Sequence, residues 1–168
     1  MPCSLTAGFT LDCKDSVGGV KSIHLIDWAK TGFTVSGGEV TATTVASGSV
    51  FTYEMPKATG SMTITTNVSQ ENGTVFNQTD VVARLRKLST TKRNELKLLA
   101  QNRVFCIVRD NNDNYWLCGR EYGCDLTALT GETGTAMGDN VGYNFTLSAI
   151  EAEAPYKLQA NVVTALGI

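Results

Sequence analysis

The one histidine of this chain is the first residue to consider for chemistry at a reaction centre. His24 lies in a segment dense in strand-forming residues, and no serine–aspartate or cysteine pattern stands near it. A general base needs a partner that orients its ring, so we expect His24 to be hydrogen-bonded or exposed rather than catalytic. No catalytic residue is therefore predicted, and we do not expect the chain to be an enzyme.

The five cysteines could in principle form disulfides or bind a metal. They are Cys3, Cys13, Cys106, Cys118 and Cys124. Their number is odd and they form no Cys-x-x-Cys pair, which argues against a disulfide framework and against a four-ligand zinc site. We expect buried, reduced thiols.

Two polar or glycine-rich stretches resemble parts of ligand-binding loops. Residues 110–114, Asp-Asn-Asn-Asp-Asn, lack the central glycine and the final glutamate of a calcium loop, and a polar β-turn is the better interpretation. Residues 131–142 are rich in glycine but contain no phosphate-binding motif and precede a strand, so we expect an ordered loop. The sequence predicts no metal site and no cofactor.

Basic residues gather in one stretch, opposed there only by Glu95. They are Arg84, Arg86, Lys87, Lys92, Arg93, Lys97 and Arg103, whereas acidic residues gather later, at Asp125, Glu132, Asp139, Glu151 and Glu153. The basic stretch is either a solvated helix face or a charged seam that meets an acidic patch on a neighbouring copy. A nucleic-acid groove would interleave aromatic residues, and none stands between Arg84 and Arg103.

The composition is typical of a β-rich domain. The 168 residues are 42% hydrophobic and 18% charged, with 16 glycines, 3 prolines and a net charge of −2. This charge gives no general attraction to nucleic acid or anionic lipid, and no apolar run approaches the roughly 20 residues of a membrane span. Because the N-terminus lacks the features of a signal peptide, we expect folding in a cytosol. The length and the lack of a linker or repeat predict a single domain over residues 1–168.

The pattern of elements predicts a mainly β fold. We expect an antiparallel β-sandwich or barrel with one flanking α-helix, a long extended hairpin and a C-terminal extension from about residue 155. The expected strands and hairpins cover residues 20–29, 31–43, 49–55, 60–85, 103–109, 115–119 and 143–153, and the helix covers residues 89–102. The Ser-Gly-Gly at 36–38 marks the turn of the first hairpin.

The hairpin over residues 60–85 is the element that we expect to drive assembly. Asn72-Gly73 is a strong hairpin-turn dipeptide, and the polar tip has few large apolar groups for the subunit's own core. Together with the basic stretch it predicts a subunit interface. The residues expected there are Asn72, Gly73, Val75, Phe76, Arg84, Arg86, Lys92 and Arg93.

The order of strands, long hairpin, one helix and further strands resembles the tail-tube fold of long-tailed bacteriophages, which the type VI secretion tube protein shares. The likeness is greatest at residues 115–119 (Tyr-Trp-Leu-Cys-Gly), 129–143 and 145–151. With residues 13–21, these segments are similar to virion proteins of phages that infect Bacteroidetes-type hosts.

This resemblance implies a structural virion protein that closes into hexameric rings, which stack as a tail tube for genome delivery. Its partners would be copies of itself and other tail or neck proteins. DNA would pass without specific binding, and the chain would contact no membrane and no small-molecule substrate. It would lie in the virion tail after assembly in the host cytoplasm.

Other readings stay open. The chain could be another virion part, such as a neck, tail-terminator or capsid-decoration protein. It could also be a carbohydrate-binding or adhesin β-sandwich, which would show exposed aromatic residues on a sheet face. A small hydrolase is disfavoured by the lack of a partnered acid–base pair. Self-polymerisation would distinguish a tube subunit from a single-ring neck protein.

Overall fold

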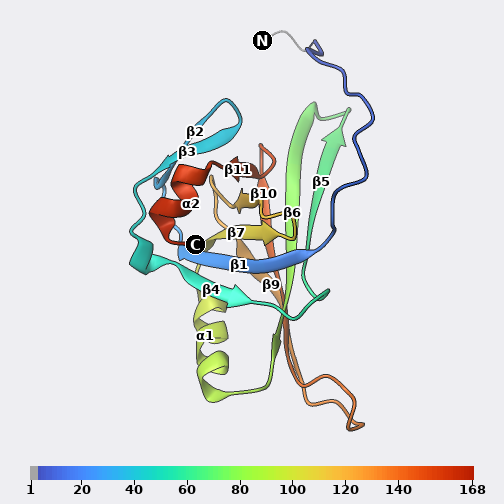
Figure 1. The fold of residues 1–168 in the computed structure, drawn as a ribbon, viewed down its shortest axis with the longest axis vertical. Coiled ribbons are helices and arrows are strands. Elements are labelled where there is room, and N and C mark those ends of the chain that lie inside the picture. The colour runs from blue at the N-terminus through green and yellow to red at the C-terminus, as the bar shows by residue number, and fades with distance from the viewer. Residues whose placement is uncertain (1–3) are drawn as a thin grey trace.

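A computed structural model describes residues 4–168 and arranges them as two β-sheets with two α-helices (Figure 1). Sheet A has the order β2-β3-β11-β8-β7-β1-β4, and sheet B has the order β5-β6-β10-β9. Sheet A consists of β1 (Val20–Asp27), β2 (Phe33–Ser36), β3 (Glu39–Thr43), β4 (Phe51–Glu54), β7 (Val104–Asp110), β8 (Tyr115–Cys118) and β11 (Tyr156–Leu158). Sheet B consists of β5 (Ser61–Ser69), β6 (Thr74–Arg86), β9 (Asp125–Glu132) and β10 (Gly142–Glu151).

The prediction of a mainly β fold is confirmed, and the two sheets are consistent with the sandwich alternative, but the sheets are not antiparallel throughout. The strand β11 pairs in parallel with β3, through Lys157 opposite Glu39 and Leu158 opposite Val40, and antiparallel with β8. The other strand pairs are antiparallel, including the predicted hairpin β2–β3, whose turn places Gly37 and Gly38 at φ 62° and 84°. Sheet A is therefore a mixed sheet.

Sheet A has a hydrophobic core on each of its faces. Between the two sheets, Ile23 and Leu25 of β1 and Cys106 of β7 pack with Phe145 and Leu147 of β10. On the opposite face lies a second cluster, which includes Phe105, Ile107, Leu117, Val162 and Leu166. Because alternate residues of β7 enter the two clusters, this strand is apolar along almost its whole length.

The predicted helix is present as α1 (Thr90–Gln101), and its ends are those expected from the sequence. The Ser89 side chain accepts a hydrogen bond from the Lys92 backbone N–H at 3.2 Å, so it caps the first turn. The backbone N–H of Asn102 donates to Leu98 at the other end. Leu96 and Leu99 are buried and attach α1 to the core between the sheets.

The expectation of a single helix is wrong, because the C-terminal segment forms a second one. The helix α2 (Ala160–Leu166) buries Val162 and Leu166 against sheet A and ends at Gly167, which has the left-handed φ of 74°. Only seven residues long and containing two adjacent valines, it has little helical tendency of its own. Packing on sheet A is what stabilises it, and the sequence alone does not display that packing.

Candidate assembly surface

The hairpin β5–β6 is confirmed and divides into a buried root and an exposed tip. Its strands pair from Ser61 opposite Val82 to Ser69 opposite Thr74, and Gly73 adopts the positive φ of 63° that its turn requires. The partner strand β10 reaches only as far as the pair Glu151–Asn77. Residues 67–76 therefore form a two-stranded ribbon beyond the rest of sheet B, which we call the tip.

The tip is less polar than its sequence suggests. Val68 and Val75 lie opposite each other and are 64% and 58% exposed, and Phe76 is also exposed. Along the same strand, Val81 is 1% exposed, because sheet A covers sheet B there but does not reach the tip. Val75 shares its face with Val81, so the apolar face of sheet B continues uncovered into the tip.

A second projection lies at the opposite end of sheet B. The loop between β9 and β10 follows the pair Gly142–Glu132, whereas the tip lies beyond the Asn77–Glu151 end of β10 (Figure 1). The carboxylate of Asp139 accepts backbone hydrogen bonds from Thr135 and Ala136, both at 2.8 Å, so the loop has internal order. Met137, between these groups, is fully exposed.

The N-terminal segment 4–17 is a third projection, which we call the arm. It extends from β1 toward the same end of the molecule as the tip (Figure 1). Leu5, Phe9 and Leu11 are 99%, 98% and 100% exposed. The sequence prediction missed the arm as a candidate interaction element, although it holds three large apolar residues within seven positions.

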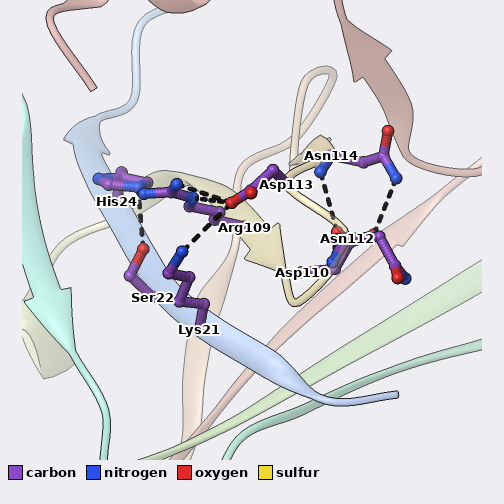
Figure 2. Close-up of polar contacts among 8 residues, drawn as sticks. All are labelled: Lys21, Ser22, His24, Arg109, Asp110, Asn112, Asp113 and Asn114. Carbon is purple, nitrogen blue, oxygen red and sulfur yellow. Dashed lines mark hydrogen bonds and ion pairs between the residues drawn. The ribbon is translucent and has the colours of Figure 1, made fainter. Parts of the chain in front are cut away.

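The turn between β7 and β8 holds the root of the arm. Asn112 accepts a hydrogen bond from the Val17 backbone N–H and donates to the Val17 carbonyl, both at 2.9 Å, and Asn111 donates to the Gly18 carbonyl at 2.7 Å. Asp110 holds the turn itself, because its carboxylate accepts backbone N–H groups of Asn112 and Asn114 at 2.9 Å (Figure 2). The predicted polar turn is thus confirmed, and it acts as a clamp on the arm.

Next to this turn, the Asp113 carboxylate is held by two cations. Arg109 donates to it at 2.7 and 3.0 Å and Lys21 at 3.3 Å (Figure 2). Hydrogen bonds from Arg109 and then Lys21 lower the pKa of Asp113, although the group is exposed. The three side chains link β1 to the end of β7. This link holds the turn that carries Asn111 and Asn112 next to the start of β1, where the arm leaves the body.

The expected interface residues lie in two groups at opposite ends of β6. Asn72, Gly73, Val75 and Phe76 lie in the tip, whereas Arg84, Arg86, Lys92 and Arg93 lie at the far end of β6 and the start of α1. About 33 Å of strand separates Phe76 from Arg86, at ~3.3 Å per residue. A single contact with one small partner surface cannot include both groups.

Several basic side chains are already engaged within the chain. Arg84 donates to Asn140 of the β9–β10 loop at 3.0 Å, and Lys92 donates to the backbone carbonyl of Arg86. Arg103 lies over the Trp28 ring at 5.3 Å. Arg86 and Arg93 are exposed, but Arg93 donates to the neighbouring Asn94 at 3.3 Å, so of the four predicted basic residues Arg86 keeps the most freedom to meet a neighbour.

The Ser22–His24 pair is the arrangement closest to a catalytic group. Ser22 Oγ lies 3.2 Å from His24 Nε2, and Thr52 Oγ1 lies 2.9 Å from Nδ1. Burial, and to a smaller extent Arg109, lowers the His24 pKa to about 4, so the ring is neutral at pH 7. A hydroxyl rather than a carboxylate orients the ring, and both residues are buried, so a substrate has no direct access to them.

Three cysteines lie together in the core between the sheets. Cys106 and Cys118 are opposite each other on β7 and β8, and Cys124 is bridged to Val104. All three are free thiols, and burial raises the pKa of each well above its usual value. The expectation of buried thiols is wrong for Cys13, which is exposed on the arm, and Cys3 lies outside the described residues.

The described surface also has a groove between β4 and α1. Phe51, Tyr53, Leu98 and Leu99 line it, together with the carboxylates of Asp27 and Glu95. Burial and the nearby Glu95 raise the Tyr53 pKa. Over residues 4–168, no three His, Cys, Asp or Glu side chains are grouped so that they could hold a metal ion.

Comparison of the chain with protein-family models, curated proteins and solved structures found no match. In the described part of the chain, no helix is long and apolar enough to cross a membrane. The functional interpretation therefore depends on the geometry itself. Its main feature is the set of three projections, the tip, the β9–β10 loop and the arm, which expose large apolar side chains.

Proposed function

We propose that this chain is a structural virion subunit that assembles with copies of itself into hexameric rings stacked as a tail tube. The observation that carries the proposal is the exposure of Leu5, Phe9, Leu11, Val68, Val75 and Met137 on segments that project from the core. Isolated exposed apolar residues are ordinary on protein surfaces, but several on projecting segments are typical of interaction sites.

The positions of the projections favour contacts that repeat. The tip and the β9–β10 loop lie at opposite ends of sheet B, so one copy can contact the next with different surfaces at its two ends. Such heterologous contacts generate rings when the rotation closes and filaments when it does not. A stacked tube needs both kinds of contact, one within the ring and one between rings.

A structural role is also favoured over a catalytic one by the lack of an accessible acid–base pair at His24. The buried Ser22 and the exposed Thr52 each pair with one ring nitrogen of the buried His24, so these contacts satisfy the hydrogen bonds of the ring. We therefore propose that these residues serve stability. Passage of DNA through the tube would require a lumen with few free lysine and arginine side chains, since each neutralised phosphate strengthens retention.

Negative-stain microscopy of the full chain, at increasing protein concentration, tests the proposal. We expect stacked rings with sixfold symmetry, and sedimentation should show species far larger than a monomer. A matched variant, Met137→Ser with Val75→Ser, changes both ends of sheet B at exposed positions. It should keep the circular dichroism spectrum of the wild type and shorten or abolish the tubes.

Other outcomes would support the rival functions. Single rings that never stack would favour a neck or terminator protein. A monomer at every concentration that binds a glycan array would favour a carbohydrate-binding sandwich. Either result would exclude the tail-tube function.

A further inference from the structure

Residues 5–13 of the arm have the sequence pattern of a β-strand with one apolar face. Apolar and polar residues alternate at every position: Leu5, Ala7, Phe9, Leu11 and Cys13 fall on one face, and Thr6, Gly8, Thr10 and Asp12 on the other. A period of two is that of a strand packed on one side. In the structure, this segment belongs to neither sheet.

Its own chain does not supply the missing partner. The clamp at Asn111 and Asn112 fixes the direction in which the arm leaves the body, and the hydrogen bonds found between arm and body begin at Val17. Leu5, Phe9 and Leu11 are almost completely exposed to solvent. Three large apolar side chains and an unpaired backbone are thus exposed to solvent.

A strand can be added only at a free sheet edge, and the described residues form four of them. The edges β2 and β4 have four residues each, and β4 is followed by Pro56. The edge β9 has a bulge in its pairing with β10 and carries Asp125 and Glu132 at its ends. Short length, bulges, charges and proline are the features that protect natural edges from pairing.

The edge strand β5 has none of these protections. Its nine residues, Ser61–Ser69, contain no charge and no proline, and they pair with β6 in continuous register. The arm pattern also spans nine residues, so the two segments match in length. Of the four edges, β5 is the one open to a further strand over that whole length.

The two faces of β5 match the two faces of the arm. Ile64 and Val68 lie on the face that continues the core and are exposed, whereas Thr63, Thr65 and Asn67 lie on the other face. An added antiparallel strand could set Phe9 beside Ile64 and Leu5 beside Val68, because both pairs are four residues apart, and Thr10 would then lie beside Thr63. Pairing of like faces across neighbouring strands is the usual source of sheet stability.

We propose that residues 5–13 of one copy add as a strand to the β5 edge of a second copy. The proposal rests on the proposed function, because it names the contact through which copies join, and it extends sheet B from four strands to five at each junction. The contact is heterologous, since the arm and β5 are different surfaces, so it can propagate from copy to copy.

Cross-linking between two full-length chains tests this contact. Both chains carry Cys3→Ser and Cys13→Ser, the first also carries Thr10→Cys on the arm, and the second carries Thr65→Cys on β5. These positions are near the middle of each segment, so they come close whether the added strand runs parallel or antiparallel. The three core cysteines are buried and do not compete for a bis-maleimide reagent.

We expect a heterodimer on a denaturing gel, with the arm and β5 peptides joined, when the two chains are mixed. Val68→Lys in the second chain should reduce the yield to background, because it places a charge on the apolar face next to the edge. Ile150→Lys is the matched control: Ile150 is also exposed on sheet B but lies on β10, and this change should leave the yield unaltered.

Three results would overturn the contact: no heterodimer, an unchanged yield with Val68→Lys, or a link within a single dilute chain that carries both new cysteines. The contact and the proposed function fail separately. If tubes form but the heterodimer does not, the tail-tube function is supported and the arm contact is refuted. If the heterodimer forms but tubes do not, the arm contact is supported and the tail-tube function is refuted.

Discussion

Shortening the β5–β6 hairpin should abolish assembly while leaving the fold intact. The change deletes residues 67–76 and joins Thr66 to Asn77 through Asn-Gly, a two-residue hairpin turn. The new turn is closed by the pair Thr66–Asn77, which already has a side-chain hydrogen bond of 2.7 Å. The second anchor of Asn77, its hydrogen bond to the Ala152 carbonyl at 2.9 Å, is also retained.

The expected cost in stability follows from the exposure of the tip. Burying a valine or phenylalanine completely contributes about 1.5–3 kcal/mol, and Val68, Val75 and Phe76 are only partly buried, so together they contribute about 2–4 kcal/mol. After the two inserted turn residues are counted, about eight fewer residues need to be ordered, which offsets much of that loss. We expect the free energy of unfolding in urea to change by less than about 1 kcal/mol.

Val81→Ala provides the comparison on the same strand. Val81 is 1% exposed between the sheets, and its truncation should cost about 2 kcal/mol through the cavity that it leaves. The shortened chain should be more stable than Val81→Ala and form no tubes in negative stain. A shortened chain that unfolds more easily than Val81→Ala, or that polymerises normally, would refute this division of the hairpin.

Three further predictions concern the core. The folded chain holds the His24 pKa at about 4, below the 6.5 of the unfolded chain, so stability should fall as pH drops from about 6.5 to 4, by up to ~3 kcal/mol; urea titrations of His24→Gln should show a smaller fall. Maleimide should label Cys13 in the native chain but none of the buried core thiols, and mass spectrometry of unreduced, denatured protein should find all five cysteines alkylated; a disulfide would contradict this. Leu166→Ala should cost about 2–4 kcal/mol in urea unfolding because this side chain is 1% exposed under α2, and a change below ~1 kcal/mol would show that α2 is not part of the core.

Local patterns predicted the elements that local chemistry determines. Asn72-Gly73 located the turn of the long hairpin, and Ser89 located the start of α1, because a turn dipeptide and a cap act within a few residues. The parallel pairing of β11 was not predictable in this way. Its three residues have no distinctive pattern, and their partners in β3 lie more than a hundred positions earlier.

The candidate surface was predicted in part. The tip residues were identified correctly as hairpin residues, but their exposed apolar face depends on how far sheet A extends over sheet B. The engagement of Arg84 by Asn140 likewise depends on a loop far along the chain. The arm was missed despite its strict alternation. That pattern predicts a strand, but it indicates an interaction element only when the structure shows that the strand has no partner in its own chain.

The insertion of β11 between β3 and β8 has a consequence for the kinetics of folding. The hairpin β2–β3 joins the rest of sheet A through β11, yet β11 leaves the ribosome after the other strands of sheet A. Sheet A therefore closes only after synthesis has passed Leu158, and such long-range closure makes folding slow. The arm and β5 are synthesised before β11, so under the proposed arm contact a nascent chain on a polysome would expose both pairing segments before sheet A is complete. Cells that produce this protein in quantity would then depend on chaperones or on low local concentration to prevent premature pairing between neighbouring nascent chains.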